Sequence, residues 1–146
     1  MKSLHLLTIF LLVSIISCKA TEEQMQEFAK CAKDQIGKPF VTTDSRGPDS
    51  FSNSGLVWFC RGVAGLSTSS TIYVSWKRVR EPKVGAHVYG IKKDNGVSVS
   101  SDCLGIIVAV NPTYIVQGNP VTKVLEMKKF TPDPKYIRTE YHYVDL

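Results

Sequence analysis

The pattern of hydrophobic positions changes along the chain, from a helical spacing in the first half to strand-like runs in the second. Between residues 21 and 36, hydrophobic residues recur at intervals of three and four, which predicts an amphipathic helix. These are Met25, Phe28, Ala29, Ala32 and Ile36. Thr21 and Gln24 have the spacing of a capping box at its start, and Gly37 with Pro39 ends it.

A second helix is predicted from residue 52 or 53 to about residue 64, with Ser52 or Asn53 as its N-cap. It is apolar on nearly every side, since its sequence reads "GLVWFCRGVA" after the cap. A helix without a polar face belongs in the interior of a domain. We therefore expect this helix to be the more buried of the two.

The second half predicts strands. "VGAHVYGIKK" and "VSVSS" flank Asp94-Asn95-Gly96, a hairpin signal, and "LGIIVAV" suits a central strand. "PTYIVQG", "VTKVLEM" and "KYIRTEYHYVDL" follow, and the last alternates so that His142 falls on the polar, exposed side. Helices followed by strands predict a single α+β domain, in which two N-terminal helices, one buried, pack on an antiparallel sheet of five to six strands.

Residues 1–20 differ from the rest in composition. Lys2 precedes an apolar run that closes on small residues, the pattern of a secretory signal peptide cleaved after Ala20. The domain would then comprise residues 21–146 and be secreted. "IISC" also fits a bacterial lipoprotein box, in which Cys18 would carry the lipid, so an anchored lipoprotein remains the alternative location.

The net charge and the number of potential metal-binding side chains limit the kinds of partner that we expect. Of 18 basic and 13 acidic residues, only Lys2 and Lys19 fall in the leader, so residues 21–146 carry a net charge of +3. The basic cluster at 76–83 has no interleaved aromatic residues, and we predict a solvated face and no specific nucleic acid partner. Only His87 and His142 remain outside the leader, without a Cys-x-x-Cys pair, so no metal or cofactor is predicted. We expect a monomer with no transmembrane segment after cleavage.

Four segments resemble, in order, the conserved blocks of the NlpC (p-sixty) cysteine peptidases. They are "AKCAKDQIGKPFV", "DSFSNSGLVWFC", "VGAHVYG" and "DCLGIIVAVNPTYIVQGN". That family has a reduced papain-like fold and cuts peptide bonds in bacterial cell walls. The resemblance implies the same fold for residues 21–146, with the nucleophile block "F-D-C-S-G-L-V" at 51–57 and the base block "H-V-G-I-Y" at 103–107.

The polar positions of these blocks are changed. Matched residue by residue, the family's nucleophile falls on Asn53, its base on Cys103 and its orienting residue on Gln117. The aspartate before the nucleophile is Ser52, and the tyrosine of the first block is Phe40. An amide cannot act as a thiolate, and a thiol is a poor substitute for an imidazole base. The resemblance therefore implies a degenerate, catalytically inactive domain.

Three functions follow as hypotheses. The first is a secreted pseudoenzyme whose former cleft binds a peptide, a cell-wall glycopeptide or a protein partner. The cleft residues implied are Phe40, Ser52, Asn53, Ser54, Tyr89, Asp102 and Cys103. The second is an active peptidase or amidase of cell-wall peptides with a rearranged site, in which Cys103 is the nucleophile and His87 the base. The third is a structural secreted protein.

The cysteine content fits an oxidising compartment. Cys31, Cys60 and Cys103 lie outside the leader, which predicts one disulfide and one free thiol. In the implied fold the two helices pack together, which favours a Cys31–Cys60 disulfide worth about 2–4 kcal/mol. Cys103 would then be the free thiol.

Overall fold

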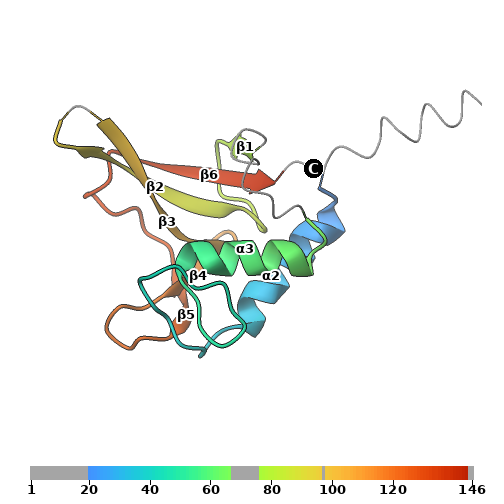
Figure 1. Cartoon of the computed structure of the whole chain (residues 1–146). Helices are drawn as coiled ribbons and strands as arrows, with labels where there is room; N and C mark the ends of the chain where they lie inside the picture. The colour runs from blue at the N-terminus through green and yellow to red at the C-terminus, as the bar shows by residue number, and fades with distance from the viewer. Residues whose placement is uncertain (1–19, 67–75, 97, 145–146) are drawn as a thin grey trace, which may run out of the picture.

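The computed structural model describes residues 20–66, 76–96 and 98–144. In this part of the chain, helices α2 (Glu22–Asp34) and α3 (Asn53–Val63) precede six strands. The strands are β1 (Trp76–Val79), β2 (His87–Asp94), β3 (Ser98–Ala109), β4 (Tyr114–Gly118), β5 (Leu125–Lys129) and β6 (Arg138–Val144). The predicted α+β architecture is thus confirmed, with both helices on one side of the sheet (Figure 1).

The sheet is antiparallel, with the order β1-β6-β2-β3-β4-β5. The main hydrophobic core lies between the helices and one face of β3 and β4, with Leu56, Ile106 and Val116 at its centre. A smaller cluster, built on Val88, Ile107 and Ile115, covers the opposite face. Neighbouring residues of a strand therefore point to different cores, as the period of two requires.

Local sequence explains both helix starts. The Thr21 hydroxyl accepts from Gln24 N–H, and the Gln24 side chain accepts from Thr21 N–H, both at 3.0 Å, so the predicted capping box is confirmed. Ser52 caps α3 by accepting from Gly55 N–H at 3.0 Å. Helix α3 buries Leu56 and Cys60 but leaves Trp58 36% exposed, with the Arg46 guanidinium 4.9 Å from the centroid of its ring.

The hairpin turn between β2 and β3 also follows from sequence. Asn95 and Gly96 both have positive φ, +48° and +77°, a backbone region that asparagine and glycine adopt more readily than other residues. The two predicted segments "VSVSS" and "LGIIVAV" form one long strand, β3, instead of two. The pairing register shifts between Val88 and Tyr89, which makes a bulge at Leu104 and Gly105.

Two features of the sheet differ from the sequence prediction. Part of the basic cluster, Trp76–Val79, is the edge strand β1, which the hydrophobic pattern did not indicate. Two members of the polar row of β6 do not face solvent: Glu140 is buried, and the side chain of His142 is only 16% exposed. Arg78 and Arg138 bind the Glu140 carboxylate at 3.2 and 2.8 Å, and these ion pairs allow it to be buried.

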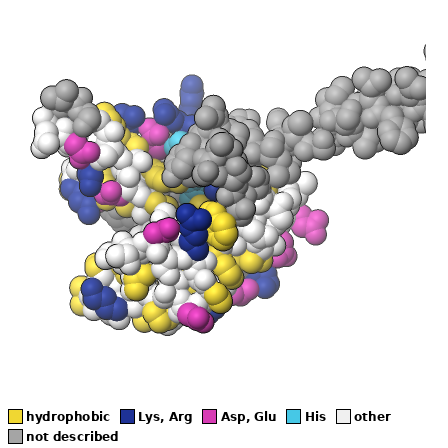
Figure 2. Space-filling model, viewed as in Figure 1, with side chains coloured by type: hydrophobic (Ala, Val, Ile, Leu, Met, Phe, Trp, Pro, Cys, Tyr) yellow, Lys and Arg dark blue, Asp and Glu magenta, His cyan; other side chains and the backbone are white. Residues whose placement is uncertain are grey.

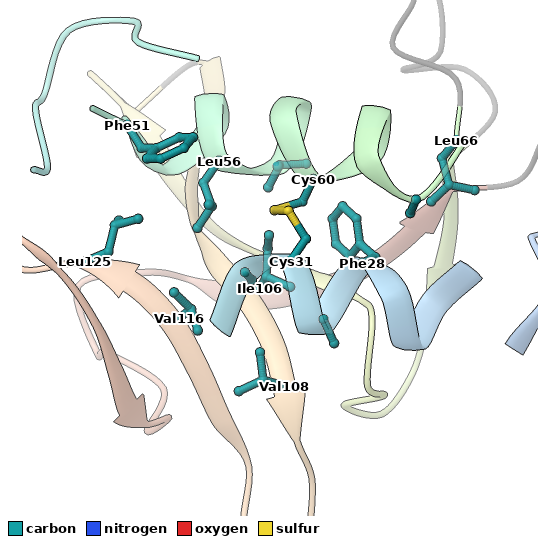
Figure 3. Packing of buried hydrophobic residues seen from close by; sticks show 14 of the residues in the cluster. Phe28, Cys31, Phe51, Leu56, Cys60, Leu66, Ile106, Val108, Val116 and Leu125 are labelled. Atoms are coloured by element: carbon teal, nitrogen blue, oxygen red, sulfur yellow. A yellow bond between two sulfur atoms is a disulfide. The ribbon is translucent and has the colours of Figure 1, made fainter. Parts of the chain in front are cut away.

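A disulfide joins Cys31 of α2 to Cys60 of α3, with Cα atoms 5.5 Å apart (Figure 3). Both residues are buried in the main core, beside Phe28 and Leu56. The predicted pairing is confirmed, and Cys103 is the free cysteine of the described residues. The disulfide therefore links the two helices covalently within the core.

The predicted signal peptide, with Cys18, lies outside the described residues apart from Ala20. Within the described ranges, neither helix has the length and hydropathy needed to cross a membrane.

Candidate functional site

A groove of about 360 Å³ opens where the first turn of α3 meets the β2–β3 hairpin. In Figure 2 the surface is indented between the part of the molecule that holds this hairpin and the part that holds β4 and β5. The groove is lined by Phe40, Val41, Thr42, Ser52, Asn53, Ser54, Tyr89, Ser101, Asp102 and Cys103. The structure therefore brings together all seven residues of the predicted cleft.

The first turn of α3 is held by a compact set of contacts. The Ser52 hydroxyl caps the helix at Gly55 and also contacts the backbone of Ser45, at 3.3 and 3.4 Å. A Cβ on Gly55 would overlap the Ser45 carbonyl oxygen, so the loop before the helix packs directly on this glycine. This contact explains why a glycine follows Ser54 in the "SGLV" segment.

Asn53 is the first residue of α3 and ties it to the end of β4. Its Oδ1 accepts a hydrogen bond from the N–H of Gly118 at 2.8 Å, across 65 positions of sequence. The same Gly118 leaves room for Phe40, whose ring occupies the space that a Cβ would need. The side chain of Asn53 therefore takes part in tertiary structure.

We expect Asn53→Ala to lower the free energy of unfolding by about 1–3 kcal/mol, because a partly buried N–H loses its acceptor. Hydrogen exchange of the Gly118 amide, followed by NMR, should become faster. Asn53→Asp keeps an acceptor oxygen and should protect the amide nearly as well as the parent residue. Equal exchange in all three proteins would mean that this bond contributes nothing.

Cys103 lies on β3, directly opposite Tyr89 in register. Gly105 determines which face Cys103 occupies, because the bulge places Cys103 and Ile106 on the same, helix-facing side. Gly105 has φ +147°, and a Cβ there would overlap the carbonyl oxygen of Val116, so only glycine fits.

The Cys103 thiol has a raised pKa. Burial raises this pKa to about 12, although hydrogen bonds with the Gly105 backbone and the Tyr89 side chain lower it to a smaller extent. The thiol is therefore protonated at neutral pH.

Asp102 reaches the groove, but its carboxylate points to the other face of the sheet. There it accepts from the Tyr136 hydroxyl at 3.0 Å and forms a salt bridge with Lys92 at 3.3 Å. Its proximity to Cys103 in sequence does not make it a partner of the thiol.

Gln117 pairs with Glu126 on β5 and does not line the groove. Its Cβ lies close to Gly105, so this side chain packs against the bulge of β3 and not in the groove.

His87 is fully buried under the helices, next to the groove but outside its lining. Its ring contacts Phe28, Tyr89 and His142, with centroids 6.3, 5.3 and 6.2 Å away. In register it lies opposite Ile106, whereas Cys103 lies opposite Tyr89. Burial lowers the pKa of His87 well below 6.5, and the charges of His142 and Arg61 act in the same direction. This imidazole is a weak base at neutral pH.

We expect the stability of the protein to fall as the pH drops below about 6.5. The unfolded chain then binds a proton at His87 that the folded chain excludes, which lowers the free energy of unfolding by up to about 1.4 kcal/mol per pH unit. Urea unfolding at pH 7 and pH 5.5 measures the effect, and His87→Gln should remove most of it. If this variant keeps the full pH dependence, another group is responsible.

Sequence reasoning missed three lining residues, Val41, Thr42 and Ser101. Ser101 could have been found by strand alternation, since it lies two positions before Cys103 on β3. Val41 and Thr42 follow Phe40 in a loop, and their pattern carries no comparable signal.

Among the described residues, no group of three or more His, Cys, Asp and Glu side chains could hold a metal ion.

Comparison with known proteins supports the fold. No protein-family model matches the sequence, and no curated protein matches it significantly. The structure is similar to two solved structures from Trichomonas vaginalis. One is NlpC2, with a TM-score of 0.62 and 16% identity over 86% of this chain and 48% of that chain. The other is NlpC1, with a TM-score of 0.63 and 15% identity over 86% and 46%. The chain thus has an NlpC-like fold and spans about half the length of these neighbours.

Proposed function

We propose that this chain is a secreted NlpC-like domain that no longer hydrolyses peptides and binds a peptide in the groove at the first turn of α3. The family's reaction needs a thiolate at this turn, where the helix dipole lowers the pKa of the thiol. Asn53 stands there, and its amide oxygen is engaged by the N–H of Gly118. This bond is the observation that carries the proposal.

The remaining groups of the groove are poorly suited to replace the lost nucleophile. Cys103 has a pKa of about 12, so only a very small fraction is thiolate at neutral pH. Tyr89, not His87, is the residue opposite Cys103. Both features weigh against the alternative in which Cys103 and His87 form a rearranged catalytic pair.

The lining suits a peptide. Thr42 and Ser54 offer hydroxyl groups that can bind backbone amides, while Phe40 and Tyr89 offer aromatic surfaces for side chains. The groove is also built before any ligand arrives, because the N-cap at Ser52 and the Asn53–Gly118 bond hold its wall. Preorganisation of this kind lowers the entropic cost of binding. The Cys31–Cys60 disulfide supports export to an oxidising compartment.

The loss of chemistry is tested by thiol labelling. At pH 7.5 we expect iodoacetamide to modify Cys103 at least about a hundredfold more slowly than in the urea-unfolded protein with its disulfide intact, because burial raises the pKa of the folded thiol from 9.0 to about 12. Peptide mapping by mass spectrometry identifies the labelled residue. Rapid labelling of folded protein would contradict the proposal.

Binding and turnover are tested together with a cell-wall tetrapeptide. We expect calorimetric binding and no hydrolysis products over a day at about 25 °C. Hydrolysis that disappears in Cys103→Ala would establish the rearranged enzyme instead. Absence of both binding and turnover, here and with the peptide pools described below, would favour a structural role.

A further inference from the structure

The groove does not end at Thr42. A second groove of about 310 Å³ is lined by Phe40, Val41, Thr42, Thr43 and Lys123. It shares Phe40, Val41 and Thr42 with the first one. The two grooves therefore adjoin at this three-residue segment, and the pair, called the channel from here on, extends from Tyr89 and Cys103 to Lys123.

The shared segment is held firmly from both sides. Phe40 N–H donates to the Lys123 carbonyl at 2.8 Å, and Val41 N–H donates to the Phe51 carbonyl at 2.9 Å. The Phe40 ring is seated against Gly118, which has no Cβ to displace it. A rigid ridge between two adjoining grooves favours an extended ligand that crosses it over a compact ligand confined to one side.

The two ends of the channel differ in charge. Lys123 and Asp102 are the charged residues among the described residues that line it. The Asp102 carboxylate faces away from the channel and is engaged by Lys92 and Tyr136. Lys123, in contrast, forms no salt bridge within the described part of the chain. The channel therefore presents one uncompensated charge, and it is positive.

A built turn sets the position of Lys123. The Asn119 side-chain oxygen accepts from Val121 and Thr122 N–H, at 2.8 and 3.2 Å. The Lys123 N–H in turn donates to the Asn119 carbonyl at 2.9 Å, and Lys123 takes a positive φ of +60°. The backbone of Lys123 is thus held beside Phe40, and its exposed side chain belongs to the lining of the second groove.

We propose that the ligand is an extended peptide that carries a free carboxylate, which pairs with Lys123 while the chain crosses Phe40 towards Tyr89. The inference rests on the proposed function and specifies its ligand. A charge-assisted hydrogen bond to a carboxylate is roughly twice as strong as one between neutral groups, and a carboxylate is the anion that a peptide itself carries. Thr42 and Thr43 beside it can bind the adjacent amide groups.

Two pools of random N-acetylated tetrapeptides, one of free acids and one of the matched amides, test the proposal. The acidic residues are omitted from both pools, so that the C-terminus is the only carboxylate. Retention on the immobilised protein, measured by mass spectrometry, should be about fivefold to tenfold greater for the acids. Lys123→Gln should abolish this preference, and Lys123→Arg should preserve it. Lys128→Ala, which removes a β5 lysine outside the channel, should change nothing.

The possible outcomes distinguish a failure of the Lys123 inference from a failure of the proposed peptide-binding function. Equal retention of acids and amides, or an unchanged preference in Lys123→Gln, would overturn the role of Lys123 while peptide binding stands. No retention from either pool would refute peptide binding itself, and with it both proposals. The glutamine of the Lys123→Gln variant is polar and only slightly shorter than the lysine, so we expect the variant to fold, and a circular dichroism melt of each variant checks this.

Discussion

Replacing Cys31 and Cys60 together by alanine is expected to lower the free energy of unfolding by about 2–4 kcal/mol. The disulfide closes a loop across a sequence separation of 29 residues, and this restricts the unfolded chain far more than the folded one. Both sulfurs are also buried in the main core, so their removal leaves unfilled space beside Phe28 and Leu56. Urea unfolding of parent and variant, without reductant, measures the difference.

The matched control is Cys103→Ala, which removes the free thiol without opening a loop. It should change the free energy of unfolding by less than about 1 kcal/mol. Added dithiothreitol should destabilise the parent and leave the double variant unchanged. A double variant as stable as Cys103→Ala would show that helix packing, and not the disulfide, holds α2 against α3.

Gly55→Ala is expected to be about as damaging, with a loss of about 2–4 kcal/mol. The added Cβ overlaps the Ser45 carbonyl oxygen, which is backbone and cannot rotate away as a flexible side chain can. Either the loop at Ser45 moves or the first turn of α3 is displaced, and both changes disturb the groove wall. Thermal unfolding measures stability, and hydrogen exchange of the Gly55 amide reports on the Ser52 cap.

Ser54→Ala is the neighbouring control, since Ser54 is exposed on the same turn and already has a Cβ. It should change stability by at most about 0.5 kcal/mol. If Gly55→Ala is equally mild, the Ser45 loop can yield without cost, and tight packing is not the reason for the glycine.

Much of the fold could be predicted because local rules and global structure agree. Thr21 with Gln24 gives the capping box, and Asn95-Gly96 gives the hairpin turn, since each needs only a few adjacent residues. The bulge at Gly105 could not be predicted in this way. Its glycine is required by the Val116 carbonyl on a neighbouring strand, a contact that no local pattern encodes.

The orientation of β6 was missed for a related reason. Alternation separates Glu140 and His142 from Tyr141, but it does not state which row faces the helices. Glu140 can be buried because Arg78 and Arg138 pair with it, and Arg78 belongs to an edge strand that the pattern did not reveal. A buried polar cluster of this kind can be recognised only once the strands are placed.

The candidate site was assembled from the family resemblance more than from periodicity. Asn53, Tyr89 and Cys103 could be expected near one another because the motif blocks imply it, and the structure places all three at one groove. The hydrogen bond from Gly118 to Asn53 and the channel towards Lys123 could not be expected. Both depend on the position of residues 118–123, the turn after β4, relative to α3 and Phe40.

The bond between Asn53 and Gly118 limits how a catalytic pair could be introduced at the groove. A cysteine at position 53 would remove the acceptor of the Gly118 amide, at a cost of about 1–3 kcal/mol, while position 103 still carried a thiol and no imidazole. A thiol–imidazole pair at these two positions would need both substitutions, and the first one alone would weaken the fold without adding a base. Any attempt to engineer such a pair should therefore first give the Gly118 amide another acceptor.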